Sequence, residues 1–122
     1  MKELKSVFSR EELAENAVKL LKKLIATPSM SRDEYNASLI IEGFFNEHQL
    51  TVNRFKNNIW ATNKHFDAGK PSILLNTHHD TVKPNKAYTL DPFIPVEKDG
   101  KLFGLGSNDA GASLVAMAQT FL

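Results

Sequence analysis

Histidine and aspartate side chains follow an apolar run in the middle of the chain. The run 73–75 leads through two polar residues into His78, His79 and Asp80. Side chains of an extended strand alternate between its two faces, so His78 and Asp80 are expected on one face and His79 on the other. A metal-bound imidazole usually donates its second N–H to a carboxylate or carbonyl, a role open to Asp80. His78 is therefore the candidate metal ligand, although such a triplet taken alone is more often structural.

A glycine-rich segment at 100–112 leads to a second candidate, Asp109, at the start of an expected helix. The dinucleotide-binding pattern requires glycine where Asp109 stands, and the charge of Asp109 would repel a pyrophosphate. This segment is therefore not expected to bind a nucleotide. The helix dipole also stabilises a carboxylate at a helix amino terminus without any function, so Asp109 taken alone is better explained as a helix cap.

The elements that must position these residues interleave helices and strands. In chain order we expect helices at 9–26 and 32–48, strands at 50–55, 59–62 and 72–77, a turn at 98–101 and a helix at 109–122. Apolar residues recur at helical spacing in the first two segments, and the apolar run at 72–77 is typical of a buried strand. The expected fold class is α/β, with a mixed or parallel sheet flanked by helices and the site at the carboxyl ends of strands.

The composition limits the kind of site and partner. No cysteine occurs among the 122 residues, so a metal would have to be held by histidine and carboxylate groups. Charges of both signs are mixed and the net charge is +1, so no nucleic-acid or membrane partner is expected. No apolar run is long enough for a signal peptide or a membrane span, and we expect a cytoplasmic protein. His48 on a helical stripe and His65 in a polar loop are expected to be structural.

Three motifs follow one another along the chain. They are Leu-Leu-Asn-Thr-His-His-Asp-Thr-Val-Lys-Pro at 74–84, Asp-Pro-Phe-Ile-Pro at 91–95 and Asp-Gly-Lys-Leu-Phe-Gly-Leu-Gly-Ser-Asn-Asp at 99–109. Together they resemble the signature of the zinc metallopeptidases and deacylases that include acetylornithine deacetylase, succinyl-diaminopimelate desuccinylase and aminoacylase. The resemblance extends upstream to Thr-Pro-Ser at 27–29 and Asn-Asn-Ile-Trp-Ala at 57–61.

This resemblance implies specific roles for the site residues. His78 would bind one metal, Asp109 would bridge two, and Asp80 would orient His78. The complete active site would hold two Zn²⁺ ions, with Co²⁺ as an alternative, and would hydrolyse the amide bond of a small N-acyl amino acid. The general base and the remaining ligands of the family lie beyond the stretch that this sequence matches.

The resemblance also implies a domain organisation. Residues 1–122 would form the amino-terminal part of a catalytic α/β domain of the zinc-dependent exopeptidase type, without its dimerisation domain. The complete protein would be a homodimer, and the 122 residues by themselves are expected to be inactive and poorly stable.

One departure from the family pattern bears on the substrate. Many members have Asp-Met-Lys-Gly where this chain has Asp-Ala-Gly-Ala at 109–112. The change favours the deacetylases that act on N-acetylornithine or a related acyl-ornithine or acyl-citrulline, in arginine biosynthesis, over the desuccinylases. The alternative from another class is a non-catalytic globular fragment or interaction module derived from such an enzyme, which would bind no metal.

Overall fold

The computed structural model describes residues 8–122. The first seven residues, where no signal peptide was expected, lie outside this range. Helix α1 (Arg10–Ile25) begins at a capping box, in which the Ser9 hydroxyl accepts from the Glu12 backbone N–H at 3.1 Å and the Ser9 N–H donates to Glu12 Oε2 at 2.7 Å. These two bonds satisfy backbone groups that a helix start leaves without partners. The predicted first helix is confirmed.

Helix α2 (Tyr35–Glu47) is three residues shorter at its start than the sequence predicted. Arg32 has a φ of 75°, which is incompatible with a right-handed helix, and the Asp33 N–H donates to the Met30 carbonyl at 2.8 Å to close a turn. The helix ends where Gln49 takes a left-handed conformation with a φ of 59°. The local backbone therefore sets both boundaries.

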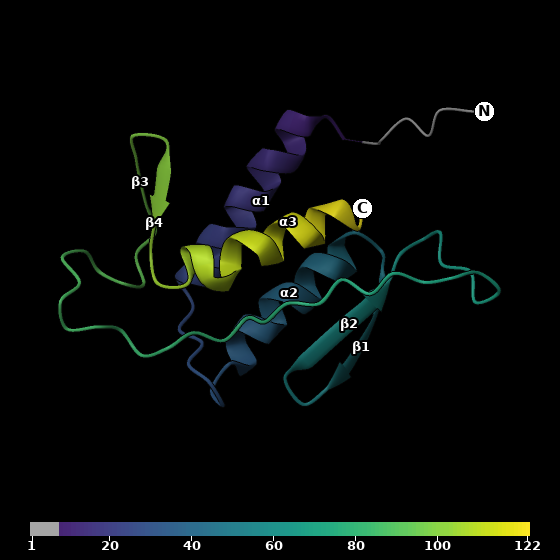
Figure 1. Ribbon diagram of the computed structural model, residues 1–122, viewed down its shortest axis with the longest axis horizontal. Coiled ribbons are helices and arrows are strands. Elements are labelled where there is room, and N and C mark those ends of the chain that lie inside the picture. The colour runs from purple at the N-terminus through teal and green to yellow at the C-terminus, as the bar shows by residue number, and fades with distance from the viewer. Residues whose placement is uncertain (1–7) are drawn as a thin grey trace.

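Strands β1 (Thr51–Phe55) and β2 (Asn58–Thr62) form an antiparallel hairpin beside α2, as Figure 1 shows. Lys56 in the two-residue turn has a φ of 56°. Arg54 anchors the hairpin to the helix, because its guanidinium contacts the Glu42 carboxylate and its Nε lies 3.0 Å from Glu42 Oε2. The two strands predicted here are confirmed.

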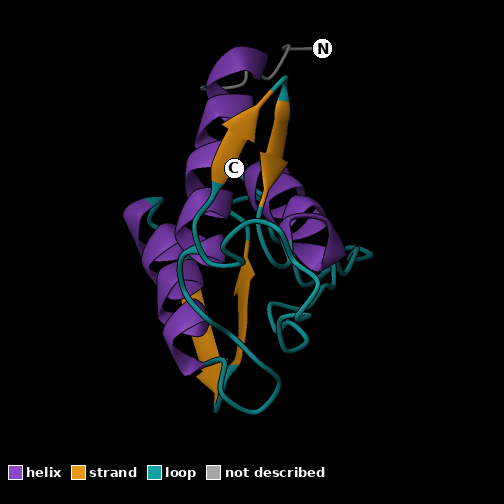
Figure 2. Cartoon of the chain, turned by 90° about the vertical axis from the view of Figure 1, so that its left-hand side faces the viewer, coloured by secondary structure: helices purple, strands orange, loops and turns teal. Residues whose placement is uncertain are grey.

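Strands β3 (Val96–Lys98) and β4 (Lys101–Phe103) form a second antiparallel hairpin. Its two turn residues, Asp99 and Gly100, have φ values of 52° and 70°. Positive φ at both positions matches the twist of a tight hairpin, for which Asp-Gly is a favoured pair. The predicted turn at 98–101 is confirmed, and Figure 2 shows the two hairpins as separate pairs of strands at opposite ends of the view.

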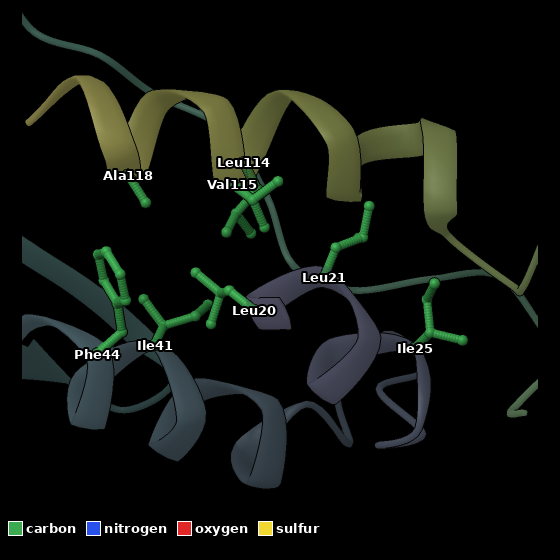
Figure 3. Close-up of a cluster of buried hydrophobic side chains, with 8 residues drawn as sticks. All are labelled: Leu20, Leu21, Ile25, Ile41, Phe44, Leu114, Val115 and Ala118. Atoms are coloured by element: carbon green, nitrogen blue, oxygen red, sulfur yellow. The ribbon is translucent and has the colours of Figure 1, made fainter. Parts of the chain in front are cut away.

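Helix α3 (Ser113–Thr120) follows a kinked turn at Ser107–Ala112, in which Asp109 and Ala110 are not helical, and packs against α1. Side chains from α1, α2 and α3 meet in the hydrophobic core, as Figure 3 shows. Its buried members are Leu20, Leu21, Ile25, Ile41, Phe44, Leu114, Val115 and Ala118. The core is thus built between helices, and each hairpin lies at its margin.

The prediction of a buried strand at 72–77 is wrong. Figure 1 shows this segment crossing the molecule as an extended chain, and residues 72–76 are exposed, with Ile73 at 88% and Leu74 at 84% of full exposure. A strand needs a neighbour that accepts and donates its backbone hydrogen bonds, and within residues 8–122 no strand pairs with this segment. An apolar sequence alone does not supply that neighbour.

Helices and strands nevertheless occur together as the α/β class requires. The expected mixed or parallel sheet does not form among residues 8–122, where the two sheets are the antiparallel hairpins. Parallel pairing is limited to an isolated bridge between Met30 and Thr81. This bridge matters for the site, because it joins the loop after α1 to the segment that carries the two adjacent histidines. In the part of the chain that the structure describes, no helix combines the length and apolar character that a membrane crossing requires.

Candidate metal centre

The segment that carries the two histidines is held in place by the loop between α1 and α2. The Thr81 N–H donates to the Ser29 carbonyl at 2.8 Å, and the Ser31 N–H donates to the Thr81 carbonyl at 3.3 Å. The buried Ser29 hydroxyl donates to the His79 carbonyl at 2.8 Å. Three hydrogen bonds therefore fix the backbone around His78 although no sheet surrounds it.

The His78 ring lies between two carboxylates. Its Nδ1 is 3.0 Å from Asp80 Oδ1 and 3.2 Å from the Asp80 carbonyl, while its Nε2 is 3.1 Å from Asp109 Oδ1. A neutral imidazole carries one proton, so only one of its nitrogens donates at a time. With the proton on Nδ1, the Nε2 lone pair is directed at the Asp109 side. The structure thus brings together the three residues that the sequence singled out.

His79 points away from this group, as the alternation of side chains predicted. Its Nε2 lies 3.0 Å from the carbonyl oxygen of Asn57, at the turn between β1 and β2. A carbonyl oxygen only accepts, so Nε2 carries the proton in this contact. His79 therefore joins the site segment to the first hairpin.

The charges around His78 shift two pKa values in opposite directions. Burial lowers the pKa of His78, but its hydrogen bonds to Asp80, the charge of Asp80 and the contact with Asp109 outweigh this effect, and the pKa is raised. The pKa of the Asp80 carboxyl is lowered, chiefly by the hydrogen bond from the Ser31 hydroxyl and further by His78, against the opposing effect of burial. Both shifts favour an imidazolium beside a carboxylate when no metal is present.

Asp109 is placed by a glycine-dependent loop that packs tightly on its surroundings. Gly106 has a φ of 75°, and a Cβ there would lie 2.6 Å from the Thr81 methyl group. A Cβ at Gly111 would lie 2.4 Å from the Gly106 carbonyl oxygen and 2.5 Å from Leu21 Cδ1. Larger residues would thus push the loop away from α1 and from the histidine segment.

The interpretation of Asp109 as a simple helix cap is wrong. Its backbone is extended, with φ −106° and ψ 101°, in the kinked turn before α3. Neither this turn nor α3 has a side-chain cap hydrogen bond. The α-helix predicted from residue 109 begins instead at Ser113. The Asp109 carboxylate is 87% exposed and is directed at His78, where a ligand could reach it.

The donor atoms fit part of a zinc site. Zinc accepts imidazole nitrogen and carboxylate oxygen, and His78 Nε2 and Asp109 offer these from positions that face each other. Asp80 is engaged by His78 and by Ser31, which suits a partner of a ligand better than a ligand. A catalytic zinc normally has three protein ligands, and residues 8–122 contain no group of three metal-binding side chains. Within residues 8–122, His78 and Asp109 thus offer two donor atoms that face each other, fewer than the three protein ligands of a catalytic zinc site.

The two remaining histidines lie outside this group. His48 Nδ1 is 2.8 Å from the Phe44 carbonyl within α2, and its ring packs on the Phe44 ring at a centroid distance of 4.4 Å. His65 is exposed in the loop after β2, where its N–H donates to Asn63 Oδ1 at 3.0 Å. The prediction that both are structural agrees with these contacts.

Ser31 is the site residue that the sequence analysis missed. Its hydroxyl donates to Asp80 Oδ2, and the two residues are 49 positions apart in the chain. The neighbouring Thr-Pro-Ser motif at 27–29 contributed to the family resemblance but suggested no role. Ser31 lies near the site because the loop after α1 pairs with Thr81, and no local sequence pattern indicates this pairing.

Comparisons with known proteins agree with the three motifs. Residues 74–122, which include both candidate ligands, match Peptidase family M20/M25/M40. The chain is 36% identical over 110 residues to a succinyl-diaminopimelate desuccinylase of Xylella fastidiosa. This match covers 81% of this chain and 28% of that protein. The chain is 37% identical over 107 residues to an acetylornithine deacetylase of Salmonella newport, which covers 75% of this chain and 27% of that protein. The resemblance to this peptidase and deacylase family is confirmed.

These relatives are much longer than the chain itself. The chain spans about 28% of their length, and a third relative, a succinyl-diaminopimelate desuccinylase of Sulfurovum, is 31% identical over 106 residues. The names of all three relatives describe the removal of an acyl group. By resemblance to them, the chain is assigned to the amidohydrolases. Identities to the two kinds of enzyme are similar, so they do not separate a deacetylase from a desuccinylase.

Proposed function

We propose that this chain contributes to a metal-dependent hydrolase that removes the acyl group from an N-acyl amino acid. The observation that carries the proposal is the position of His78, whose Nε2 lies 3.1 Å from Asp109 Oδ1 while its Nδ1 lies 3.0 Å from Asp80 Oδ1. A histidine ligand usually donates its second ring N–H to a carboxylate or carbonyl, which is where Asp80 lies, and this leaves the other nitrogen on the side of Asp109. The names of the relatives supply the reaction class.

Each of the three side chains has a distinct task in this proposal. Asp80 holds the proton on His78 Nδ1, which fixes the ring and keeps the Nε2 lone pair free. Asp109 adds negative charge opposite that lone pair, so His78 Nε2 and Asp109 would hold a divalent cation together. Such a cation would polarise the amide carbonyl of the substrate when bound. We propose that the remaining ligands and the general base come from other residues of a longer protein.

Finer features of the function rest on the family resemblance. We propose zinc as the metal, with cobalt as a substitute, and a cytoplasmic homodimer as the complete protein. Within the deacylases, Asp-Ala-Gly-Ala at 109–112 favours N-acetylornithine or a related acyl-ornithine or acyl-citrulline, and hence a role in arginine biosynthesis. A panel of acetylated and succinylated amino acids, assayed with the protein as encoded, would rank these substrates.

Metal binding is the direct test of the proposed function. Addition of Co²⁺ to the complete, metal-free protein should produce the visible absorption of a bound ion, and His78→Ala should abolish it. His65→Ala is the matched control, because His65 lies exposed in the loop after β2, where its backbone N–H donates to Asn63 Oδ1. Absence of metal binding, or equal binding by the His78→Ala protein, would favour the non-catalytic interaction module instead.

A further inference from the structure

The Asp80 carboxylate has two oxygens, and each meets a different partner. Oδ1 accepts from His78 Nδ1 at 3.0 Å, and Oδ2 accepts from the Ser31 hydroxyl. A carboxylate bound through one oxygen can still rotate about its side-chain bonds. A carboxylate bound through both oxygens by partners on different segments keeps one orientation.

Ser31 itself is well fixed for this task. Its backbone N–H donates to the Thr81 carbonyl at 3.3 Å, and the bridge between Met30 and Thr81 aligns the two segments in parallel. The Ser31 hydroxyl is therefore tied to the same backbone that carries Asp80.

We propose that Ser31 is a positioning residue for the metal site. Its hydroxyl orients the Asp80 carboxylate, which in turn keeps the His78 proton on Nδ1 and leaves Nε2 free toward Asp109. This role rests on the proposed function, because a free Nε2 matters only if His78 is a ligand. Two consecutive hydrogen bonds link the three residues: Ser31 donates to Asp80, and Asp80 accepts from His78.

The neutral His78 ring offers a readout that does not depend on metal or activity. Two tautomers compete: the proton on Nδ1 is stabilised by Asp80, and the proton on Nε2 is stabilised by Asp109. Heteronuclear NMR of the ring nitrogens distinguishes them at a pH where the ring is neutral. In the unmodified chain the Nδ1–H form should predominate, because Asp80 presents both a carboxylate and a carbonyl oxygen to Nδ1.

The experiment compares three variants in the same loop. Ser31→Ala should shift the tautomer population toward Nε2–H, whereas Ser31→Thr, which keeps a hydroxyl, should restore the Nδ1–H form. Thr27→Ala is the matched control, because the Thr27 hydroxyl donates to the Lys23 carbonyl in α1, 2.9 Å away, and not to the segment that carries His78. Ser31 is exposed, so its replacement by alanine should leave the fold intact.

Co²⁺ titration of the same proteins provides the second readout. Ser31→Ala should weaken binding by about tenfold, the lower end of the range for residues that support a ligand, with rescue by Ser31→Thr. An unchanged tautomer population in Ser31→Ala, or an equal shift in Thr27→Ala, would overturn the proposed role. If the complete protein binds no Co²⁺, the proposed function fails, and the tautomer comparison still decides whether Ser31 positions the ring.

Discussion

Replacement of Gly111 by alanine should destabilise the protein and disturb the candidate site together. The new Cβ would lie 2.5 Å from Leu21 Cδ1 and 2.4 Å from the Gly106 carbonyl oxygen. Carbon atoms pack best at about 3.5–4.0 Å, so one side of this contact must move by about 1 Å. Leu21 is buried in the core and the Gly106 carbonyl accepts from the Gly111 N–H at 2.9 Å, so neither side moves freely.

The expected magnitude follows from the cost of overpacking. A methyl group forced into a packed site destabilises by about 1–3 kcal/mol. Gly43→Ala is the matched control, because Gly43 lies inside α2 and a Cβ there would meet nothing within 4 Å. Alanine in a helix interior is better than glycine by about 0.5–1 kcal/mol, so this control should gain stability. The two variants should therefore differ by about 1.5–4 kcal/mol.

Urea denaturation followed by circular dichroism measures the free energy of unfolding of both variants. The same Gly111→Ala protein should also bind Co²⁺ more weakly, because Asp109 lies two residues away and its loop must shift. Gly111→Ala with the stability and metal affinity of the unmodified protein would refute the argument that close packing places Asp109. So would an equal loss of stability in the Gly43→Ala control.

Three further predictions concern the histidine and its partner. In the complete protein, His78→Ala should abolish metal binding while His79→Ala leaves it largely intact, and a greater loss from His79→Ala in metal titration would reverse the assignment. Asp80→Asn should weaken metal binding by about 10- to 100-fold, and unchanged affinity would exclude its orienting role. Metal affinity should fall as the pH falls through the raised pKa of His78, because protons compete for Nε2; a titration series that is flat with pH would contradict this.

The pKa shifts of His78 and Asp80 predict how the stability of the protein changes with pH. The His78 contribution should be fully present below its unfolded pKa of about 6.5 and lost as the pH rises through its raised folded value. The Asp80 contribution should be present above its unfolded pKa of about 3.9 and lost as the pH falls through its lowered folded value. His78→Ala should therefore destabilise the metal-free protein more at mildly acidic than at alkaline pH. Denaturation of both proteins across this range checks it, and a constant difference would contradict it.

Features set by neighbouring residues could be predicted from the sequence. The helix at 9–26 and the turn at 98–101 were predicted from residue types, and the structure forms them through contacts a few positions apart, at Ser9–Glu12 and at Asp99–Gly100. The separation of His78 from His79 followed from the alternation of side chains along an extended chain, which does not need a neighbouring strand. These interactions do not require knowledge of the rest of the fold.

Features that depend on distant segments could not be predicted in the same way. The run at 72–77 has the composition of a buried strand, but its state depends on whether another strand lies beside it. The contact between Ser31 and Asp80 depends on the bridge from Met30 to Thr81, which no local pattern encodes. The family resemblance identified His78 and Asp109 as a pair because it carries information about tertiary contacts that periodicity lacks.

The candidate site is assembled from three separate stretches of chain, at Ser31, at His78–Asp80 and at Asp109. The unfolded chain does not hold these groups together, so an ion that binds the pair would bind the native state preferentially. Binding of the ion therefore stabilises the folded protein against unfolding. A ligand at one hundred times its dissociation constant raises the free energy of unfolding by about 2.7 kcal/mol. Metal supply would thus set how much of this chain is folded as well as whether its site is loaded.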